Sequence, residues 1–195
     1  TSIDATAVRY VYLDAPDTNN VSVVYSRSGG MFEAMAAVTT NGGGSFALTS
    51  VYGPDFVASV RDVEMLDANT IVVAYLAPFG IDIAINTAQS VDGGATFPSF
   101  GTIDTALSFQ EHMSLASSST SDLALCYQNI NEDNYIATSS DSGASWTPVL
   151  LEAGPNTNTL CAIDMVSAND IFVLYANSSG GATLGTTANG GTSWN

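Results

Sequence analysis

Three polar residues occupy matching places along the chain, and each stands directly before a methionine. They are Glu64, His112 and Asp164, followed by Met65, Met113 and Met165. Two carboxylates and an imidazole that faced one channel would form a weak metal or polar-ligand site, because these groups bind divalent metals. The alternative, which we favour, is that the three side chains line a solvated channel wall and bind nothing.

A second set of oxygen ligands lies in the segment NINEDNY, where Asn129, Asn131 and Asp133 alternate. Alternating side-chain oxygens open a calcium loop of the EF-hand type, which also needs a glycine at its sixth position and a glutamate at its twelfth. Neither stands at the corresponding position here. The sequence therefore favours a polar loop between two strands, with calcium as the alternative, and it indicates no other cofactor.

Residues for acid–base or nucleophilic catalysis are sparse. His112 is the only histidine, and the chain has neither a His-Glu-x-x-His zinc motif nor a Gly-x-Ser-x-Gly nucleophile elbow. Glu111 precedes His112, but adjacent residues on a strand point to opposite faces. The 19 acidic residues contain many pairs that could serve a glycosidase, and the sequence singles out none of them.

The two cysteines, Cys126 and Cys161, form either one disulfide bond or two buried thiols, and the sequence leaves both open. Asn20 and Asn177 each begin an Asn-x-Ser sequon and are candidate sites of N-glycosylation. A chance match is the equal alternative, because the chain is rich in asparagine and serine.

The composition is that of a folded, acidic protein. Of the 195 residues 46% are hydrophobic, and 19 acidic residues against three arginines and no lysine give a net charge of -16. Such a charge repels phosphate, so we expect neither nucleic-acid binding nor docking on anionic membranes. The longest apolar stretch, Ile71 to Ile81, is too short to span a bilayer. The many small polar residues suit a secreted β-protein, and we expect an extracellular or cell-surface location.

One pattern recurs four times and organises the whole chain. The segments TTNGGGSF, SVDGGATF, SSDSGASW and TANGGTSW begin at residues 39, 90, 139 and 187. Each follows a short apolar run that ends in tyrosine: VSVVY, IVVAY, LALCY or IFVLY. A period of about 50 residues is typical of propeller blades and other repeat architectures.

Each repeat predicts four antiparallel strands joined by turns. The apolar runs are nearly continuous, which indicates strands buried on both faces, as happens when sheets stack face to face. No apolar pattern of helical period is present. We therefore predict an all-β fold, either a β-propeller or an open array of about four blades. The expected blade limits are near 1–50, 51–100, 101–149 and 150–195.

The four recurring segments resemble the Asp-box, Ser/Thr-x-Asp-x-Gly-x-x-aromatic, of sialidase and sortilin-like β-propellers. The residues at its Asp, Gly and aromatic positions are Asn41, Gly43, Phe46, Asp92, Gly94, Phe97, Asp141, Gly143, Trp146, Asn189, Gly191 and Trp194. The resemblance implies a structural role in the hairpin between the third and fourth strands, away from the ligand face. There a carboxylate or amide can close the turn, glycine can take a positive φ, and the ring can fill the gap between sheets.

Sialidases, to which the resemblance also extends, hold the substrate carboxylate with three arginines, one of them usually in an Arg-Ile-Pro motif. The chain has only Arg9, Arg27 and Arg61, and it has no Arg-Ile-Pro. We therefore expect a non-catalytic structural or adhesive module, with a glycan as a candidate ligand. A sialidase-like glycoside hydrolase, or a fragment of one, is the alternative.

The fourth repeat has no fourth strand in this sequence. Its third strand, near Ala182 to Ala188, carries no charged residue or proline that would discourage pairing. Such an edge can be completed by further residues of a longer propeller, by the segment Thr1 to Ala5, or by another chain. We expect the last of these, in which copies self-associate into an oligomer or a filament.

Overall fold

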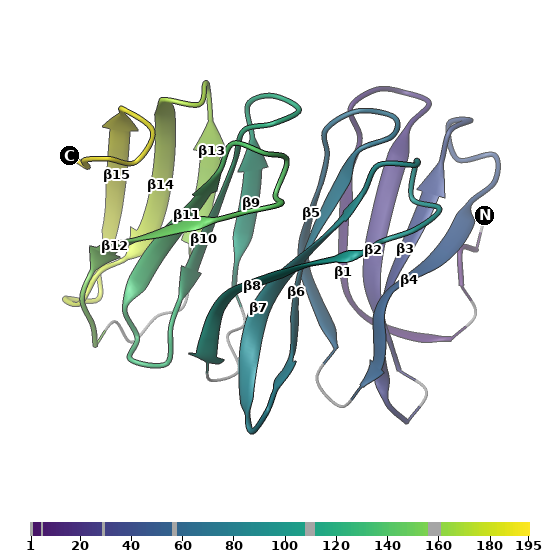
Figure 1. Ribbon diagram of the computed structural model, residues 1–195, viewed down its shortest axis with the longest axis horizontal. Coiled ribbons are helices and arrows are strands. Elements are labelled where there is room, and N and C mark those ends of the chain that lie inside the picture. Colours follow the sequence, from purple (N-terminus) through teal and green to yellow (C-terminus); the bar gives the residue numbers. More distant parts are fainter. Residues whose placement is uncertain (1, 5, 29, 56–57, 108–111, 156–160) are drawn as a thin grey trace. The chain divides into compact units, whose positions relative to one another are not determined.

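The computed structural model describes residues 2–4, 6–28, 30–55, 58–107, 112–155 and 161–195. Within these residues the protein is all β: fifteen strands form four antiparallel sheets, and there is no helix (Figure 1). The predicted all-β fold of blade-like sheets is thereby confirmed.

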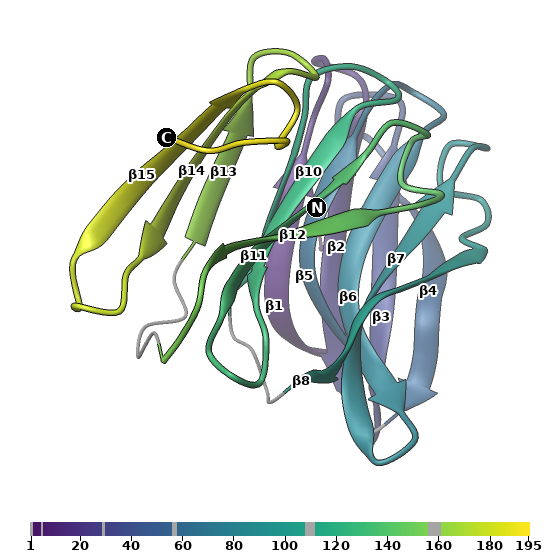
Figure 2. The same ribbon diagram turned by 60° about the vertical axis from the view of Figure 1, so that its left-hand side comes forward.

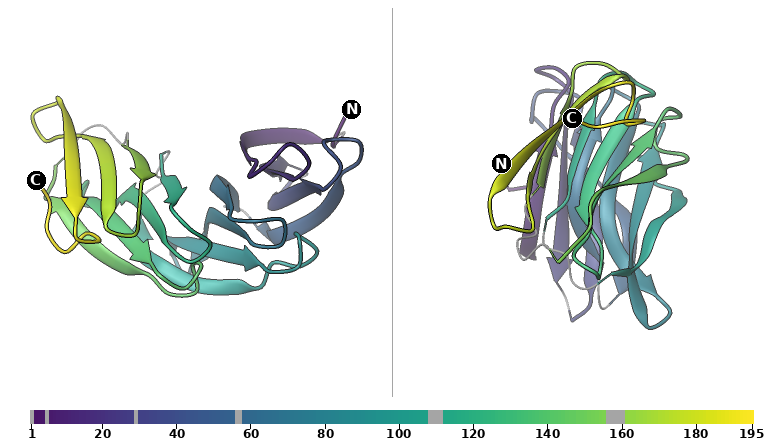
Figure 3. Two further views of the ribbon diagram at one scale, coloured as in Figure 1. Left: turned by 90° about the horizontal axis from the view of Figure 1, so that it is seen from above. Right: turned by 90° about the vertical axis from the view of Figure 1, so that its left-hand side faces the viewer.

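Every sheet is a meander in which consecutive strands are neighbours, as the colour gradient shows (Figures 2 and 3). The first sheet contains β1 (Ala7–Asp14), β2 (Val21–Ser28), β3 (Phe32–Thr39) and β4 (Ala47–Asp55). The second contains β5 (Ser59–Met65), β6 (Ile71–Phe79), β7 (Asp82–Ser90) and β8 (Ser99–Leu107). The third contains β9 (Ser114–Ser117), β10 (Leu123–Gln128), β11 (Asn134–Ser139) and β12 (Thr147–Glu152). The fourth contains β13 (Cys161–Met165), β14 (Asp170–Ala176) and β15 (Ala182–Ala188).

The chain divides into two compact units, each of which we describe by itself. Residues Thr1–Thr102 form the first unit, with the first sheet and most of the second, and Ile103–Asn195 form the second, with the end of β8 and the third and fourth sheets. The expected blade limits fall inside β4, β8 and β12, because the last strand of each of these sheets follows the recurring turn.

Each sheet has two faces, which we name from the apolar run on its second strand. The leading face carries the first, third and fifth residues of the run, such as Val73 of the second sheet. The trailing face carries the residues between them, such as Val24 of the first sheet. Side chains alternate along a strand, so a continuous apolar run supplies both faces.

In both units the trailing face of one sheet packs against the leading face of the next. In the first unit Val24, Ala36 and Val38 share a core with Ile71, Val73 and Tyr75. In the second unit Ala124, Cys126 and Ile136 share a core with Ile171, Val173 and Tyr175. Burying each large side chain in this way contributes about 1.5–3 kcal/mol, so stacking is what stabilises the sheets.

Two hydrogen bonds also tie the first sheet to β5. The backbone N–H of Val60 donates to Ser26 Oγ at 3.0 Å, and that of Met65 donates to Asp14 Oδ2 at 2.7 Å. Because β5 is the first strand of its sheet, these bonds fix how the first strands of the two sheets lie against each other.

Candidate functional site

Each of the four recurring turns is closed by hydrogen bonds that the first and third residues of the segment make. In every copy the hydroxyl of the first residue donates to Oδ1 of the Asn or Asp at 2.8 Å. That hydroxyl accepts the amide of the glycine four residues on, at 2.8–3.1 Å. Oδ1 in turn accepts another amide four residues further along, at 2.8–3.0 Å. The glycines, Gly43, Gly94, Gly143 and Gly191, have φ values of +84° to +87°.

Asparagine and aspartate close this turn with opposite hydrogen-bond directions at the second side-chain atom. Oδ2 of Asp92 accepts the Thr96 hydroxyl at 2.7 Å, whereas Nδ2 of Asn41 donates to the Ser45 hydroxyl at 3.0 Å. A hydroxyl can serve as either donor or acceptor, so both residue types fit. Asn189 repeats the arrangement of Asn41, with Nδ2 donating to Ser193 at 2.9 Å.

The aromatic residue that ends each turn lies against a sheet. Phe97 is buried in the core of the first unit, and Trp194 packs against the core of the second. Phe46 packs on the leading face of the first sheet. Trp146 is half-buried, and its indole N–H donates to the carbonyl of Gly143 at 3.0 Å.

The three candidate channel residues do not share one position. Glu64 lies opposite Val72 on β5, and Asp164 lies opposite Phe172 on β13, so these two match. At the corresponding place on β9 stands Ala116, opposite Ala124. His112 is exposed and lies before β9 begins, so the methionine spacing placed it four residues out of register.

The segment from Asn129 to Asp133, between β10 and β11, is a loop that uses its own oxygens as acceptors. Oδ1 of Asn129 accepts the amides of Asn131 and Asp133 at 2.9 and 3.0 Å. Oδ1 of Asp133 accepts the amide of Gly154 at 2.6 Å. In the described part of the chain, no group of three or more His, Cys, Asp or Glu side chains could hold a metal ion.

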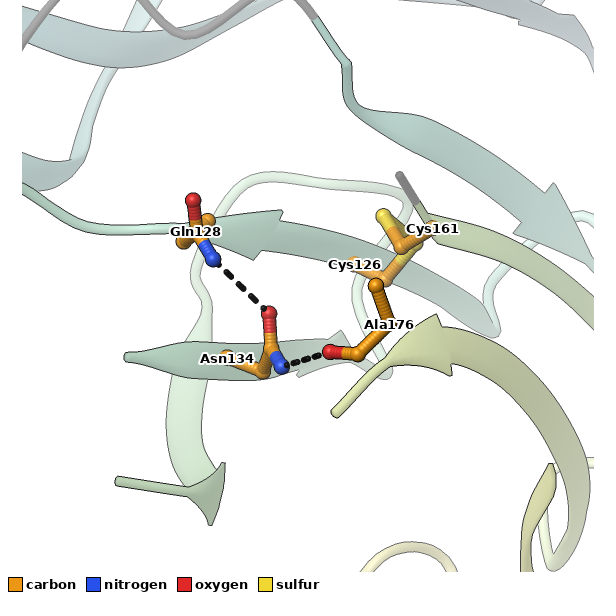
Figure 4. The surroundings of a disulfide bond; sticks show 5 residues. All are labelled: Cys126, Gln128, Asn134, Cys161 and Ala176. Carbon is orange, nitrogen blue, oxygen red and sulfur yellow. Dashed lines mark hydrogen bonds between the residues drawn. A yellow bond between two sulfur atoms is a disulfide. The ribbon is translucent and has the colours of Figure 1, made fainter. Parts of the chain in front are cut away.

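Cys126 on β10 and Cys161 on β13 are joined by a disulfide bond (Figure 4), with their Cα atoms 6.3 Å apart. The bond therefore links the third sheet to the fourth. Nearby, Nδ2 of Asn134 donates to the carbonyl of Ala176 at 2.9 Å and makes a second link between these sheets.

Both sequon asparagines lie in turns that use their side chains. Nδ2 of Asn20 donates to Oδ2 of Asp17 at 2.7 Å, and Nδ2 of Asn177 donates to the hydroxyl of Thr183 at 3.0 Å. Glycosylation at either residue stays a prediction.

The first strands of the two sheets in the first unit each carry a bulge that the first strands of the other two sheets lack. The pairing of β1 with β2 is interrupted at Tyr10, which has a φ of 50°, and the pairing of β5 with β6 is interrupted at Arg61. The guanidinium carbon of Arg61 lies 4.6 Å from the centroid of the Tyr10 ring. β9 and β13 pair with their neighbours without a bulge. Bulges re-aim side chains and are frequent beside binding sites, so these two mark the candidate site.

Arg61 and Tyr10 differ sharply in exposure. Arg61 is only 3% exposed, whereas Tyr10 is 44% exposed. One Arg61 nitrogen donates to the hydroxyl of Ser59 and to the carbonyl of Val60, which holds the guanidinium in place. The attraction between the Arg61 cation and the face of the Tyr10 ring restrains that ring. The site therefore presents a restrained phenol ring to solvent.

Tyr12 and Asp62 complete the electrostatics of this site. Burial raises the pKa of the Tyr12 phenol above its usual value, an effect that Arg61 partly offsets and Asp62 reinforces. The phenol of Tyr12 is therefore protonated at neutral pH, and it is a hydrogen-bonding group and not an activated nucleophile.

The three arginines do not converge. Arg9 lies over the ring of Phe32, 5.7 Å from its centroid. Arg27 pairs with Glu33 and, at 3.7 Å, with Asp4. By the strand register Arg27 falls on the leading face of the first sheet and Arg9 on the trailing face. An arginine clamp around one carboxylate would need all three guanidinium groups at one point, so this arrangement does not form one.

The Arg27 cluster borders a hollow of about 470 Å³, lined in part by Thr6, Ser28 and Met31. Asp4 caps this cluster, and its pKa is lowered to about 2, mainly by the backbone N–H of Thr6 and then by the Thr6 and Tyr25 hydroxyls. The charges in this cluster satisfy one another, so we place the candidate site at Tyr10 and Arg61.

Sequence reasoning did not find this site, because no residue pattern announces a β-bulge. A signal was present in retrospect. The first strands of the first and second repeats, VRYVYL and VRDVEML, are the ones that carry arginine, in a chain with only three. In a chain of net charge -16 with three arginines, an arginine on each of these two first strands was the available signal.

No family model matches the chain, and no curated protein matches it in sequence. Solved structures do match. The Hadza microbial sialidase Hz136 aligns with a TM-score of 0.60 at 14% identity, over 87% of this chain and 34% of its own. The Niastella koreensis GH74 enzyme aligns with a TM-score of 0.58 at 15% identity, over 90% of this chain and 28% of its own. The fucose-specific lectin from Aleuria aurantia aligns with a TM-score of 0.56 at 17% identity, over 90% of this chain and 55% of its own.

At such low identities the likeness shows the fold alone, an all-β architecture of the propeller type. This chain spans about a third of the sialidase and just over half of the lectin. The described residues contain no helix long and apolar enough to cross a membrane.

Proposed function

We propose that this protein is a secreted, non-catalytic glycan-binding module whose repeats follow the Asp-box pattern. The observation that carries the proposal is the stack of Tyr10 on Arg61, built by bulges on the first strands of the first two sheets. Fold likeness to a sialidase and to a fucose-specific lectin supports the proposal, since both names refer to sugars.

The chemistry of a sugar suits this stack. A pyranose ring has an apolar face of C–H bonds that packs on an aromatic ring, and hydroxyl groups around its rim that need donors and acceptors. Tyr10 supplies the exposed ring, and Tyr12 and Asp62 supply polar groups near it. Because Arg61 braces the ring, little side-chain freedom is lost on binding.

A non-catalytic role fits the same residues. The Tyr12 phenol is held protonated, and the three arginines are divided between two faces of the first sheet and the bulge on β5. The disulfide between Cys126 and Cys161 is a bond that persists in oxidising, extracellular surroundings. We include in the proposal an adhesive role in which copies of the chain associate.

Binding to an array of neutral, uronic-acid and sulfated oligosaccharides tests the proposal. We expect specific glycans to be retained by the wild type and by Tyr10→Phe, and to be lost, by at least about tenfold in affinity, with Tyr10→Ala, since a stacked ring contributes roughly 1–3 kcal/mol. Phe79→Ala is the matched control, because Phe79 is an exposed aromatic (54%) on the second sheet and away from the bulges.

Retention of no glycan, or equal retention by Tyr10→Ala, would overturn the glycan proposal. Release of free sugar from a retained glycan would replace it with the glycoside hydrolase alternative.

A further inference from the structure

Asparagine is followed by glycine at two places in the sequence, and both places are recurring turns. The dipeptides are Asn41-Gly42 and Asn189-Gly190, at the position where the other two turns carry Asp92 or Asp141. An Asn-Gly dipeptide is chemically labile, because glycine has no side chain to keep its backbone nitrogen from the preceding side-chain amide. Both asparagines are exposed, so water has access to them.

The reaction of such a dipeptide converts the asparagine amide to a carboxylate. The backbone nitrogen of glycine gives up its proton and attacks Cγ of the asparagine, which closes a succinimide ring and releases the side-chain nitrogen as ammonia. One water molecule then opens the ring. If the bond between nitrogen and Cγ breaks, the product is aspartate. If the bond to the backbone carbonyl carbon breaks, the product is isoaspartate, whose main chain runs through Cβ and Cγ.

The folded turn holds the side chain that would be attacked. Oδ1 of Asn41 accepts the hydroxyl of Thr39 at 2.8 Å and the backbone N–H of Ser45 at 3.0 Å, and Nδ2 donates to the Ser45 hydroxyl at 3.0 Å. A Cβ atom added at Gly44 would lie 3.2 Å from Cγ of Asn41, so the carboxamide packs over Gly44. Asn189 makes the equivalent hydrogen bonds in the fourth sheet. Attack on Cγ requires the side chain to leave these partners.

The attacking nitrogen is also engaged in both turns. The N–H of Gly42 donates to the carbonyl of Asn19 at 3.0 Å, and that of Gly190 donates to the carbonyl of Asn169 at 3.1 Å. These two carbonyls belong to the turns that precede β2 and β14. An amide must lose its proton to attack, and a proton that is hydrogen-bonded to a carbonyl is lost less readily. The reaction therefore requires the recurring turn to separate from the turn beside it.

We propose that Asn41 and Asn189 are modification sites that deamidate when their turn opens, and that the folded turn accepts the aspartate product but not isoaspartate. Aspartate fits because the chain already builds this turn with it. Oδ2 of Asp92 accepts the Thr96 hydroxyl at 2.7 Å, where Nδ2 of Asn41 donates to a hydroxyl. A hydroxyl serves as donor or acceptor, so the turn re-forms after the amide has become a carboxylate.

Isoaspartate does not fit because it lengthens the main chain within the turn. The hydroxyl of Thr39 accepts the backbone N–H of Gly43 at 3.1 Å, and this bond spans the modified residue. An additional main-chain atom between residues 41 and 42 moves that N–H out of register with the hydroxyl. A turn that opens and reacts therefore either closes again with one more negative charge or stays open.

Peptide mapping by mass spectrometry after incubation at mildly alkaline pH tests the dependence on turn opening. We expect both asparagines to convert at least about tenfold more slowly in the native protein than in the same protein unfolded in urea. Thr39→Ala removes the hydroxyl that donates to Asn41 and accepts from Gly43. It should speed conversion of Asn41 by about tenfold, through the loss of these hydrogen bonds, and leave Asn189 unchanged.

Thr187→Ala is the reciprocal variant, and it should speed conversion of Asn189 alone. Each variant keeps one turn intact as the control within the same molecule. Equal rates in the native and the unfolded wild type would overturn the dependence on turn opening. So would equal rates at the two asparagines in a variant that still unfolds cooperatively.

Pulse proteolysis tests which product the turn accepts. Wild-type protein is aged in urea, refolded, and exposed briefly to protease at a urea concentration near the midpoint, where unfolded molecules are cleaved. We expect aspartate at residue 41 or 189 to survive as well as asparagine does, and isoaspartate at the same residue to be depleted among the survivors. Survival of both products in equal proportion would show that the turn does not discriminate between them and would overturn that part of the proposal.

Discussion

At Gly94 two constraints act on one residue. Its φ is +85°, and a Cβ atom there would lie 2.5 Å from Cγ2 of Val38, in the interface of the first two sheets. A side chain at this place therefore meets both backbone strain and overpacking. The conformation of the turn and the packing of the core behind it therefore both require glycine at this position.

We expect Gly94→Ala to lower the free energy of unfolding by about 2–5 kcal/mol, from roughly 1–2 kcal/mol of backbone strain and ~1–3 kcal/mol of overpacking. Gly80→Ala is the control, because Gly80 has a φ of +64° but no atom within 4 Å of the added Cβ. Urea denaturation measures both variants. Equal losses in the two would show that Val38 yields and that only the backbone matters.

Asp92 and Asp141 make the turns sensitive to acid. The pKa of Asp92 is lowered from its usual 3.8, first by the backbone N–H of Thr96, and that of Asp141 first by the hydroxyl of Ser145. A carboxylate with a depressed folded-state pKa stabilises the fold above its unfolded pKa and loses that effect as pH falls through the folded value. The turns should therefore weaken below about pH 4.

The double variant Asp92→Asn, Asp141→Asn tests this dependence. The chain itself uses asparagine in its other two turns, so the variant should fold. We expect its melting temperature to fall less between pH 5 and pH 2 than that of the wild type, by on the order of a few degrees. Parallel curves for the two proteins would assign the acid sensitivity to other carboxylates.

The elements that sequence predicts well here are those set by local patterns. The apolar runs ending at Tyr25 and Tyr75 predict strands buried on both faces, and those strands are β2 and β6. The recurring turn predicts where the third and fourth strands meet. The bulges at Tyr10 and Arg61 are different, because a bulge depends on how two strands pair and not on either strand alone. His112 was misplaced for a similar reason, since an aligned methionine says nothing of strand register.

The disulfide covalently links two secondary-structure elements, β10 and β13. It closes a sequence separation of 35 residues, for which the chain-entropy model gives about 3–4 kcal/mol. We expect the double variant Cys126→Ala, Cys161→Ala to be less stable by this amount in urea melts. The first unit provides the internal control, because the mutations lie outside it. A loss under ~1 kcal/mol would show that packing and the Asn134 bond hold the fourth sheet without it.

At the scale of the whole molecule, one repeated unit serves two purposes. Regular stacking of trailing on leading faces gives stability, and the bulges on β1 and β5 carry the proposed glycan interaction. Tyr10 and Arg61 break the strand pairing and offer a braced ring.

The most direct test of the central claim is to follow the ring resonances of the protein by NMR during titration with an oligosaccharide retained on the array. The account predicts that the Tyr10 ring signals shift saturably with the ligand, while those of Phe79 do not. Saturable binding that shifts other aromatic rings and leaves Tyr10 unmoved would contradict the assignment of the glycan site.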